Sequence, residues 1–462
     1  MSAPRPKLTG GSGRAMPALR RFMASQMAAA VAAATLLAGV SAVPVAAAQP
    51  LLKNLPQVGN LTTPPTTSDC LTLFAIHCYQ PAQFVKAYDL APLFNHGIDG
   101  RGQTIAIVDS FGSPTIANDL HVFDTTFGLP DPPSLKVIAP AGAIPPFDVT
   151  NSDMTGWAEE TTLDVEWAHV FAPGANILLV ETPVSETEGV TGFPEIVKAE
   201  NYVIDHNMAD VITQSFGATE NTFPSKSSLL NLRSAFINAA FHHVTVLGSS
   251  GDTGATDYQL NQSDLYTFRV NSWPSSDPLV TSIGGTQLTL DNAGNRLAPD
   301  VVWNDGYGAG GGGVSSVFSR PDFQDSVRRV VDGRRGTPDI SLSAAVDGAV
   351  VFYYSFLPGH VGYHLVGGTS ESSPEFSGIV ALADQVAHHR LGQINGRLYD
   401  MLQGHSHGIV DVTMGNNTFG PFVNSDNLTY TVVGYDAGRG YDLASGVGTI
   451  DAARFVPELA GH

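Results

Sequence analysis

A regular alternation of apolar strand patterns and amphipathic helical patterns constrains the fold of this chain most. Mostly apolar segments predict strands at 103–108, 175–181, 210–216, 243–248, 279–283 and 349–354. Helical patterns fall between them at 115–127, 157–170, 191–206 and 225–241. Such alternation predicts an α/β fold, a parallel sheet with helices on both faces. Loops at the carboxyl ends of parallel strands are where such proteins build their sites.

Three further segments extend this outline. Residues 81–94 have a helical pattern, and 291–338, rich in Gly, Asn and Asp, predict long loops. Within that stretch, the glycines from Gly310 to Gly313 could line a substrate cleft or belong to a flexible loop without contacts. Both interpretations stay open.

The segment Gly-Gly-Thr-Ser-Glu-Ser-Ser-Pro, at 367–374, follows an apolar stretch, 361–366, that predicts a short strand. It precedes an amphipathic run from Pro374 to His389 that predicts a helix. The glycines allow a tight turn and close approach of a substrate. A helix N-terminus favours negative charge near Ser370, and Pro374 suits a first helical turn. The alternative is that Thr-Ser is an ordinary helix cap.

Carboxyl groups mark two other places. Glu160 and Asp164 are four residues apart on the predicted helix at 157–170, so they share one face. They could be solvated charges or, if buried together, a pair that shares a proton. Asp252, within Gly-Asp-Thr-Gly, follows the predicted strand at 243–248. The alternative for Asp252 is an ordinary turn residue.

These motifs together resemble those of the sedolisin family, the serine-carboxyl peptidases with a subtilisin-like fold. The family's Gly-Thr-Ser-x-x-x-Pro motif matches 368–374, Glu-x-x-x-Asp matches Glu160 and Asp164, and Gly-Asp-x-Gly matches the loop of Asp252. The similarity covers roughly residues 78–458. It implies a doubly wound, mainly parallel sheet and a peptidase domain at 78–462.

The resemblance implies a mechanism for hydrolysing peptide bonds. Ser370 would attack the scissile carbonyl, and Glu160 would take its proton and return it to the leaving amine. Asp164 would orient Glu160 and share its proton. Asp252 would donate a hydrogen bond to the developing oxyanion, which requires a protonated carboxyl. Both carboxyl roles favour action in acid.

The resemblance also implies one bound Ca²⁺ near the C-terminus. The family's calcium pattern corresponds to Asp411-Val412 and to Gly438-Arg-Gly440-Tyr-Asp442. Asp411 and Asp442 would supply carboxylate oxygens, and Val412, Gly438 and Gly440 would supply carbonyl oxygens. The alternative is a surface turn without metal.

Two other functions stay open. The first is a subtilisin-type Asp-His-Ser peptidase, with Asp109 at the end of a strand and His169 as the histidine nearest the right segment. The second is a catalytically weak binding or scaffold protein on a peptidase fold. Asp109 could instead join the carboxyl network around Asp164, and Phe216 stands where the family often has another aromatic residue.

Composition limits the partners. The chain of 462 residues has 23 Lys and Arg against 43 Asp and Glu, a formal net charge of −20, which argues against nucleic-acid binding. Only 14% of residues are charged and 48 are glycine, so we expect a compact, loop-rich molecule. We expect a monomer that acts on proteins or peptides.

The N-terminal region predicts export. Residues 1–48 combine Arg14, Arg20 and Arg21 with an apolar core and a small-residue cleavage site, the pattern of a signal peptide. We therefore expect a secreted protein with no stable membrane association once the signal is removed. A flexible lead at 49–77 would end in a Cys70–Cys78 disulfide, because exported cysteines usually pair. The lead at 49–77 is too short to be the long prosegment that sedolisins usually carry.

Overall fold

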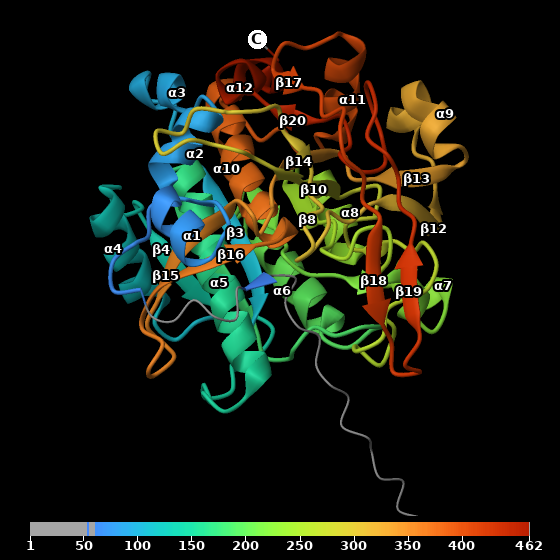
Figure 1. The fold of residues 1–462 in the computed structure, drawn as a ribbon, viewed down its shortest axis with the longest axis horizontal. Coiled ribbons are helices and arrows are strands. Elements are labelled where there is room, and N and C mark those ends of the chain that lie inside the picture. Colours follow the sequence, from blue (N-terminus) through green and yellow to red (C-terminus); the bar gives the residue numbers. More distant parts are fainter. Residues whose placement is uncertain (1–52, 55–60, 462) are drawn as a thin grey trace, which may run out of the picture. The chain divides into compact units, whose positions relative to one another are not determined.

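A twisted, mostly parallel sheet organises the computed structural model, which describes residues 53–54 and 61–461 (Figure 1). Its strand order is β11-β10-β8-β6-β3-β5-β4, with β14 beside β10. Neighbouring strands are parallel except for the β10–β11 pair. The strands are β3 (Thr104–Ser110), β4 (Leu135–Ile138), β5 (Asn176–Thr182), β6 (Val211–Thr213), β8 (Thr245–Ser249), β10 (Thr281–Gln287), β11 (Val301–Val302) and β14 (Ile340–Ser343). The expected α/β fold with a mainly parallel sheet is confirmed.

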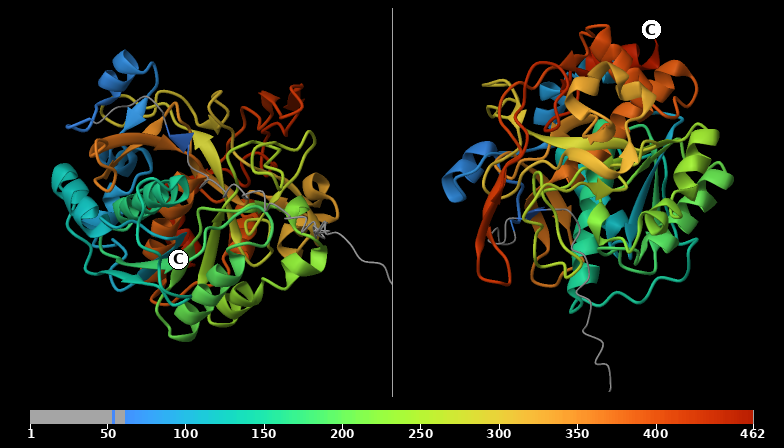
Figure 2. Two further views of the ribbon diagram at one scale, coloured as in Figure 1. Left: turned by 90° about the horizontal axis from the view of Figure 1, so that it is seen from below. Right: turned by 90° about the vertical axis from the view of Figure 1, so that its right-hand side faces the viewer.

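Helices cover both faces of this sheet, as predicted (Figure 2). On one face, α10 (Thr369–Ala387) packs along α5 (Ser152–Phe171) and crosses β10, β14, β8, β6 and β3. On the other face, α6 (Phe193–Asp205) contacts β5 and β3, and α8 (Ser234–Phe241) contacts β8. Outside the inner layer, α4 (Ile116–Phe127) packs on α5, and α12 (Ala452–Ala460) packs on α10. The two longest described helices, α5 and α10, therefore lie side by side at the centre.

A second sheet holds the strand that leads into α10. Its order is β1-β16-β15-β2, from β1 (Lys53–Asn54), β16 (Gly362–Gly367), β15 (Ala349–Tyr354) and β2 (Cys78–Tyr79). The predicted strands at 349–354 and 361–366 thus exist, but they form an antiparallel pair outside the central sheet. Residue Gly367 ends β16 directly before the turn into α10.

Several predicted elements differ from those in the structure. The predicted helix at 81–94 is two helices, α2 (Pro81–Ala87) and α3 (Ala91–Asn95), because Asp89 has a φ of 57°, which a continuous helix cannot contain. The predicted helix at 225–241 is likewise divided into α7 (Lys226–Leu230) and α8. Pro374 lies inside α10, not in its first turn, since the helix begins at Thr369.

The stretch 291–338 is not simply loop. Besides β11, it contains β12 (Gly313–Ser319), a 3-10 helix (Asp322–Val327), α9 (Arg328–Val331) and β13 (Arg334–Thr337), with β12 and β13 paired. The remaining short elements are β7 (Ala218–Thr219), a 3-10 helix (Glu220–Thr222), β9 (Ser272–Trp273), α11 (Asn395–Gln403), β17 (Ile409–Val410), β18 (Phe419–Val423), β19 (Thr429–Val432) and β20 (Thr449–Ile450).

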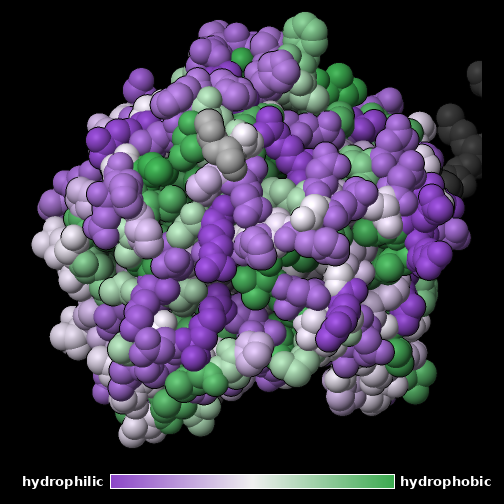
Figure 3. All heavy atoms as spheres, turned by 90° about the horizontal axis from the view of Figure 1, so that it is seen from above, coloured by the Kyte–Doolittle hydropathy of each residue, from purple (hydrophilic) through white to green (hydrophobic). Residues whose placement is uncertain are grey.

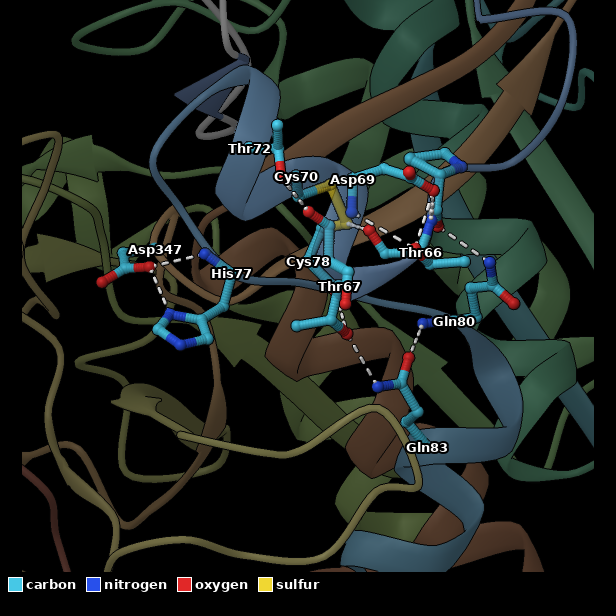
Figure 4. The surroundings of a disulfide bond; sticks show 12 residues. Thr66, Thr67, Asp69, Cys70, Thr72, His77, Cys78, Gln80, Gln83 and Asp347 are labelled. Atoms are coloured by element: carbon cyan, nitrogen blue, oxygen red, sulfur yellow. Dashed lines mark hydrogen bonds and ion pairs between the residues drawn. A yellow bond between two sulfur atoms is a disulfide. The ribbon is translucent and has the colours of Figure 1, made fainter.

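The predicted disulfide joins Cys70 to Cys78 (Figure 4). It ties α1 (Thr67–Leu73) to β2, and α1 begins with a capping box in which Thr66 and Asp69 satisfy each other's backbone amides. The Thr67 hydroxyl also donates to the Cys78 carbonyl at 2.8 Å. The described part of the lead, 61–77, therefore contains regular structure that its composition did not predict.

The predicted signal segment at 1–48 lies outside the described residues. Among those that are described, no helix is long and apolar enough to cross a membrane. The face seen from above in Figure 3 is mostly hydrophilic, with apolar residues scattered over it.

Candidate active site

Ser370 lies in the first turn of α10 and is fully buried. The preceding Gly368 has a φ of 151°, a backbone conformation that favours glycine and lets β16 turn directly into the helix. The Ser370 hydroxyl donates to the Ser215 carbonyl at 3.5 Å and also interacts with the Glu160 carboxyl, where it favours the charged form. The predicted nucleophile and the predicted base are therefore neighbours.

Glu160 and Asp164 face α10 from α5, and both side chains are fully buried. Burial is the largest cause that raises the pKa of each carboxyl well above its ordinary value. Asp109, at the end of β3, adds a like charge that raises both pKa values further. Burial and the charge of Glu181 raise the pKa of Asp109 itself to about 7, although the Thr161 hydroxyl lowers it. The acidic pair is thus buried and not a solvated helix face.

Ser215 connects this carboxyl group to the nucleophile. Its hydroxyl lies 2.9 Å from Asp164 Oδ1 and 3.4 Å from the Ser370 carbonyl oxygen. In an uninterrupted helix the amide of residue 374 would donate to the carbonyl of residue 370, but proline has no N–H. Pro374 therefore leaves the Ser370 carbonyl available to Ser215.

Asp252 follows β8 and is held by the residue before the nucleophile. The backbone N–H and the hydroxyl of Thr369 donate to Asp252 Oδ1 at 2.8 and 2.9 Å. The Thr369 hydroxyl also accepts from the Gly251 amide at 3.1 Å. With Oδ1 engaged twice, a proton on Oδ2 would leave Asp252 able to donate a hydrogen bond next to Ser370.

The glycine run at 310–313 is buried and supports the Asp252 loop. The Gly311 amide donates to the Gly251 carbonyl at 2.7 Å, and the Ser250 hydroxyl donates to the Gly311 carbonyl at 2.8 Å. A Cβ on Gly311 would meet the Ser250 carbonyl oxygen at 2.0 Å, which no side chain tolerates. Glycine is needed at position 311 because its backbone packs directly against the backbone of Ser250.

His169 belongs to the core instead of to this cluster. It is fully buried on α5, and its Nε2 lies 2.7 Å from the Pro130 carbonyl oxygen. Burial lowers the pKa of its imidazole to about 4. It follows Glu160 by nine residues, about 13 Å along the helix. Phe216 packs against Trp157 and Phe193 with ring centroids 6.1 and 6.2 Å away, which gives it a packing role.

One C-terminal loop brings the predicted calcium ligands together. The Gly440 amide donates to Asp411 Oδ2 at 3.0 Å, and the Gly438 amide donates to Asp442 Oδ2 at 2.9 Å. Asp442 Oδ1 accepts from the Ala444 and Ser445 amides, while Val412 is buried beneath. No group of three or more His, Cys, Asp or Glu side chains suited to a metal occurs in the described part of the chain. A cation here would need backbone carbonyls and water besides the two carboxylates.

With this geometry established, comparison with known proteins identifies the family. Residues 152–393, more than half of the chain, match the profile described as "Subtilase family". The chain belongs to the subtilase family. The matched region contains Glu160, Asp164, Asp252 and Ser370.

The predicted resemblance to sedolisins, a serine-type peptidase family, is also confirmed. The chain is 29% identical to kumamolisin from a Bacillus species over 389 residues, which are 82% of this chain and 63% of kumamolisin. It is 33% identical to sedolisin from a Pseudomonas species over 277 residues, 58% of this chain and 43% of sedolisin. The chain thus spans less than two thirds of these relatives.

A solved structure supports the same assignment. Pseudomonas sedolisin (serine-carboxyl proteinase), complexed with two molecules of pseudo-iodotyrostatin, superposes with a TM-score of 0.68 at 28% identity. The match covers 82% of this chain and 97% of that one. The subtilisin-like fold of this subtilase is therefore shown.

Sequence reasoning missed two residues that hold the site together, Ser215 and Thr369. Ser215 lies at the carboxyl end of a predicted parallel strand, the same rule that singled out Asp252, so its position could have marked it. Thr369 was treated as part of a motif and not as a hydrogen-bond donor. Its role depends on the contact with Asp252, which is 117 residues away in the sequence.

Proposed function

We propose that this protein is a serine-carboxyl peptidase that hydrolyses peptide bonds in acid. One observation carries the proposal: the Ser370 hydroxyl, at the start of α10, interacts with a fully buried Glu160 whose pKa is raised. A buried carboxylate near a hydroxyl is a suitable general base. Proteins and peptides are the proposed substrates.

The proposed reaction follows from the site's protons. Ser370 Oγ attacks the scissile carbonyl carbon while its proton passes to ionised Glu160, and Asp164 stays protonated and orients Glu160. The carbonyl oxygen becomes negative and accepts a hydrogen bond from the protonated Oδ2 of Asp252. Glu160 then protonates the amine as the C–N bond breaks, which leaves an acyl ester on Ser370. Water attacks that ester while Glu160 takes its proton, and Glu160 passes this proton to Ser370 Oγ as the ester C–O bond breaks, which releases the acid and restores the serine.

The proposed activity in acid follows from the protonation states of these carboxyl groups. Ionisation of Asp109, with its pKa of about 7, adds a negative charge beside Glu160 and Asp164 as the pH approaches neutrality. The mechanism needs Asp164 and Asp252 protonated, so each lost proton reduces the active fraction.

The decisive experiment combines a substrate series with one substitution. Purified protein is incubated with a quenched peptide library from pH 3 to pH 8, alongside Ser370→Ala and, as a matched serine control, Ser377→Ala on the same helix. Activity confined to acid and lost only in Ser370→Ala supports the proposal. An inactive wild type that still binds peptides favours the scaffold alternative, and a rate that rises through neutral pH favours an Asp-His-Ser enzyme.

We also propose that the C-terminal loop binds one Ca²⁺ through Asp411, Val412, Gly438, Gly440 and Asp442. The oxygen donors suit this ion, and the space beside Gly438 and Gly440 contains no neighbouring atom within 4 Å of an added Cβ. When bound, the ion would offset the negative charge of Asp411 and Asp442 and fasten the loop. Calcium titration of wild type, Asp442→Ala and the exposed control Asp436→Ala tests this.

Export is the last part of the proposal. The basic and apolar pattern of residues 1–48 and the Cys70–Cys78 disulfide both suit a secreted protein. Expression of the full chain in the native host, followed by N-terminal sequencing of protein from the medium, would test secretion and cleavage. Retention of the whole chain inside cells would contradict it.

A further inference from the structure

A cavity lined by histidine and arginine lies at the end of the central sheet opposite the candidate active site. Three of its residues come just before strands: Gln103 precedes β3, Asp210 precedes β6, and His243 lies two residues before β8. The cavity therefore lies at the amino edge of the sheet, whereas Asp109 and Asp252 lie at the carboxyl edge. The seven residues of β3, at about 3.3 Å each, separate the two edges by roughly 20 Å.

The cavity has a volume of about 780 Å³, a size that suits a small ligand. Its basic side chains are His242, His243, His388, His389, Arg390 and Arg397. They include four of the chain's 14 histidines, and Asp210 is the one acidic residue among the described residues that line the cavity. A neighbouring cavity, which shares Gln103 and His388, adds His96 and Arg101. In a chain with a formal net charge of −20, this concentration of basic groups requires an explanation.

Both arginines are anchored through one nitrogen each. Arg390 Nε donates to Asp210 Oδ1 at 2.6 Å, and Asp210 Oδ2 accepts from the Thr104 amide at 2.7 Å. Arg397 Nη1 donates to the Leu459 carbonyl at 2.8 Å. A guanidinium has five N–H donors, and neither arginine makes a second hydrogen bond with a described residue. Each guanidinium is thus held in place with donors left for a ligand.

The histidine rings change from acceptor to donor when they gain a proton. His242 Nδ1 lies 3.1 Å from the Asn238 carbonyl oxygen, and His389 Nδ1 lies 2.7 Å from the Ala387 carbonyl oxygen. A ring nitrogen beside a carbonyl oxygen carries the hydrogen, so Nε2 of each neutral ring has a lone pair. Protonation adds a positive charge and turns Nε2 into an N–H donor. The cavity therefore becomes suited to an anion in acid.

Few acids oppose this charge. Asp210 is paired with an arginine, and Asp99 pairs with Arg101 at 2.6 Å in the neighbouring cavity. Burial raises the pKa of Asp384, on α10, to about 8, so this carboxyl is neutral in acid. The other titratable groups near the ends of the surrounding helices do not line the cavity; they are Asp205, His206 and Glu458. With four protonated histidines, the lining carries six positive charges against the one negative charge of Asp210.

We propose that this cavity binds a small ligand with several linked phosphate groups, and that binding strengthens in acid as the histidines gain protons. A carboxylate loses its own charge near its pKa of about 4, whereas a phosphate group keeps a negative charge below its second pKa of about 6. Guanidinium groups bind phosphate oxygens through parallel hydrogen bonds. A single phosphate ion would fill only part of the cavity, and a long polyanion would also meet the acidic surface. The inference goes beyond the proposed peptidase function and does not depend on it.

Isothermal titration calorimetry with tripolyphosphate, at pH 5 and pH 8, tests the site. Wild type should bind at least about tenfold more tightly at pH 5, although tripolyphosphate itself is more negative at pH 8. Arg397→Gln should weaken binding about tenfold at both pH values, and the exposed control Arg329→Gln should not. The double variant His242→Gln/His389→Gln should reduce the pH difference to about threefold, whereas the exposed control His121→Gln should preserve it.

Three results would overturn the proposal: no binding at pH 5, the same affinity in Arg397→Gln as in wild type, or tighter binding at pH 8. Citrate, a carboxylate probe, should bind at least about tenfold more weakly than tripolyphosphate at pH 5, and equal affinity would overturn the assignment to phosphate. Arg397→Lys keeps the charge and should retain most of the affinity, which separates loss of the site from loss of the fold. Unchanged thermal melting of each variant without ligand completes that control.

Discussion

Replacing Glu200 by glutamine should stabilise the protein near neutral pH but not in acid. Glu200 lies on α6, fully buried, and neither carboxyl oxygen accepts a hydrogen bond within the described part of the chain. Burial alone raises its pKa from 4.5 to about 8. The folded protein therefore holds a proton that the unfolded chain releases above pH 4.5, and stability falls as pH rises through this window.

The size of the effect follows from that window. From pH 4.5 to pH 7 the folded state remains protonated while the unfolded state does not, and each pH unit costs about 1.4 kcal/mol. Over 2.5 units this amounts to about 3 kcal/mol. Glutamine has nearly the same shape and no charge to lose, so the variant avoids this cost.

Urea unfolding at pH 4 and pH 7 measures the difference. We expect Glu200→Gln to match wild type within about 1 kcal/mol at pH 4 and to exceed it by about 3 kcal/mol at pH 7. Glu195→Gln, on the same helix but partly exposed, is the control and should show a much smaller change between the two pH values. An equal difference at both pH values would refute the reasoning, because the effect would then come from packing and not from a proton.

The remaining predictions concern the site, the metal and the disulfide. Ser370→Ala should lower kcat by at least about a thousandfold with an unchanged circular dichroism spectrum, and a purified variant as active as wild type would exclude Ser370 as nucleophile. The kcat/KM profile of wild type should fall as pH approaches 7, where Asp109 ionises, whereas a profile that rises through pH 7 would contradict the carboxyl mechanism. Chelator should lower the melting temperature of wild type but not of Asp442→Ala, and an unchanged wild-type curve would argue against the metal. Removing the disulfide with Cys70→Ser and Cys78→Ser should cost about 2.5 kcal/mol in the free energy of unfolding, and a loss under 0.5 kcal/mol would indicate a structured unfolded chain.

The sequence predicted the sheet well because buried parallel strands have a strong local pattern. The strand at 103–108 and its neighbours appear within a few residues of their expected bounds. The strand at 349–354 was also predicted, but its sheet was not, because its partner β16 and the more distant β2 are not encoded in its own residues. The division of the helix at 81–94 depends on the backbone of Asp89, which an apolar pattern does not reveal.

As with the sheet, residue spacing predicted part of the candidate site, and contacts between distant segments determined the rest. The spacing of Glu160 and Asp164 placed them on one face, but burial, which raises their pKa values, depends on α10 packing over them. The contact between Thr369 and Asp252 exists only once two segments more than 100 residues apart meet.

The proline in α10 links the protonation of Asp164 to the backbone at Ser370. Because Pro374 frees the Ser370 carbonyl, the single hydrogen of the Ser215 hydroxyl has two acceptors, that carbonyl and Asp164 Oδ1. A hydroxyl donates fully to only one acceptor at a time, and an ionised carboxylate attracts it more strongly than a neutral one. The direction of one O–H bond is therefore coupled to the protonation of Asp164, and rotation of that bond transmits the change to the backbone of the nucleophile without moving any heavy atom.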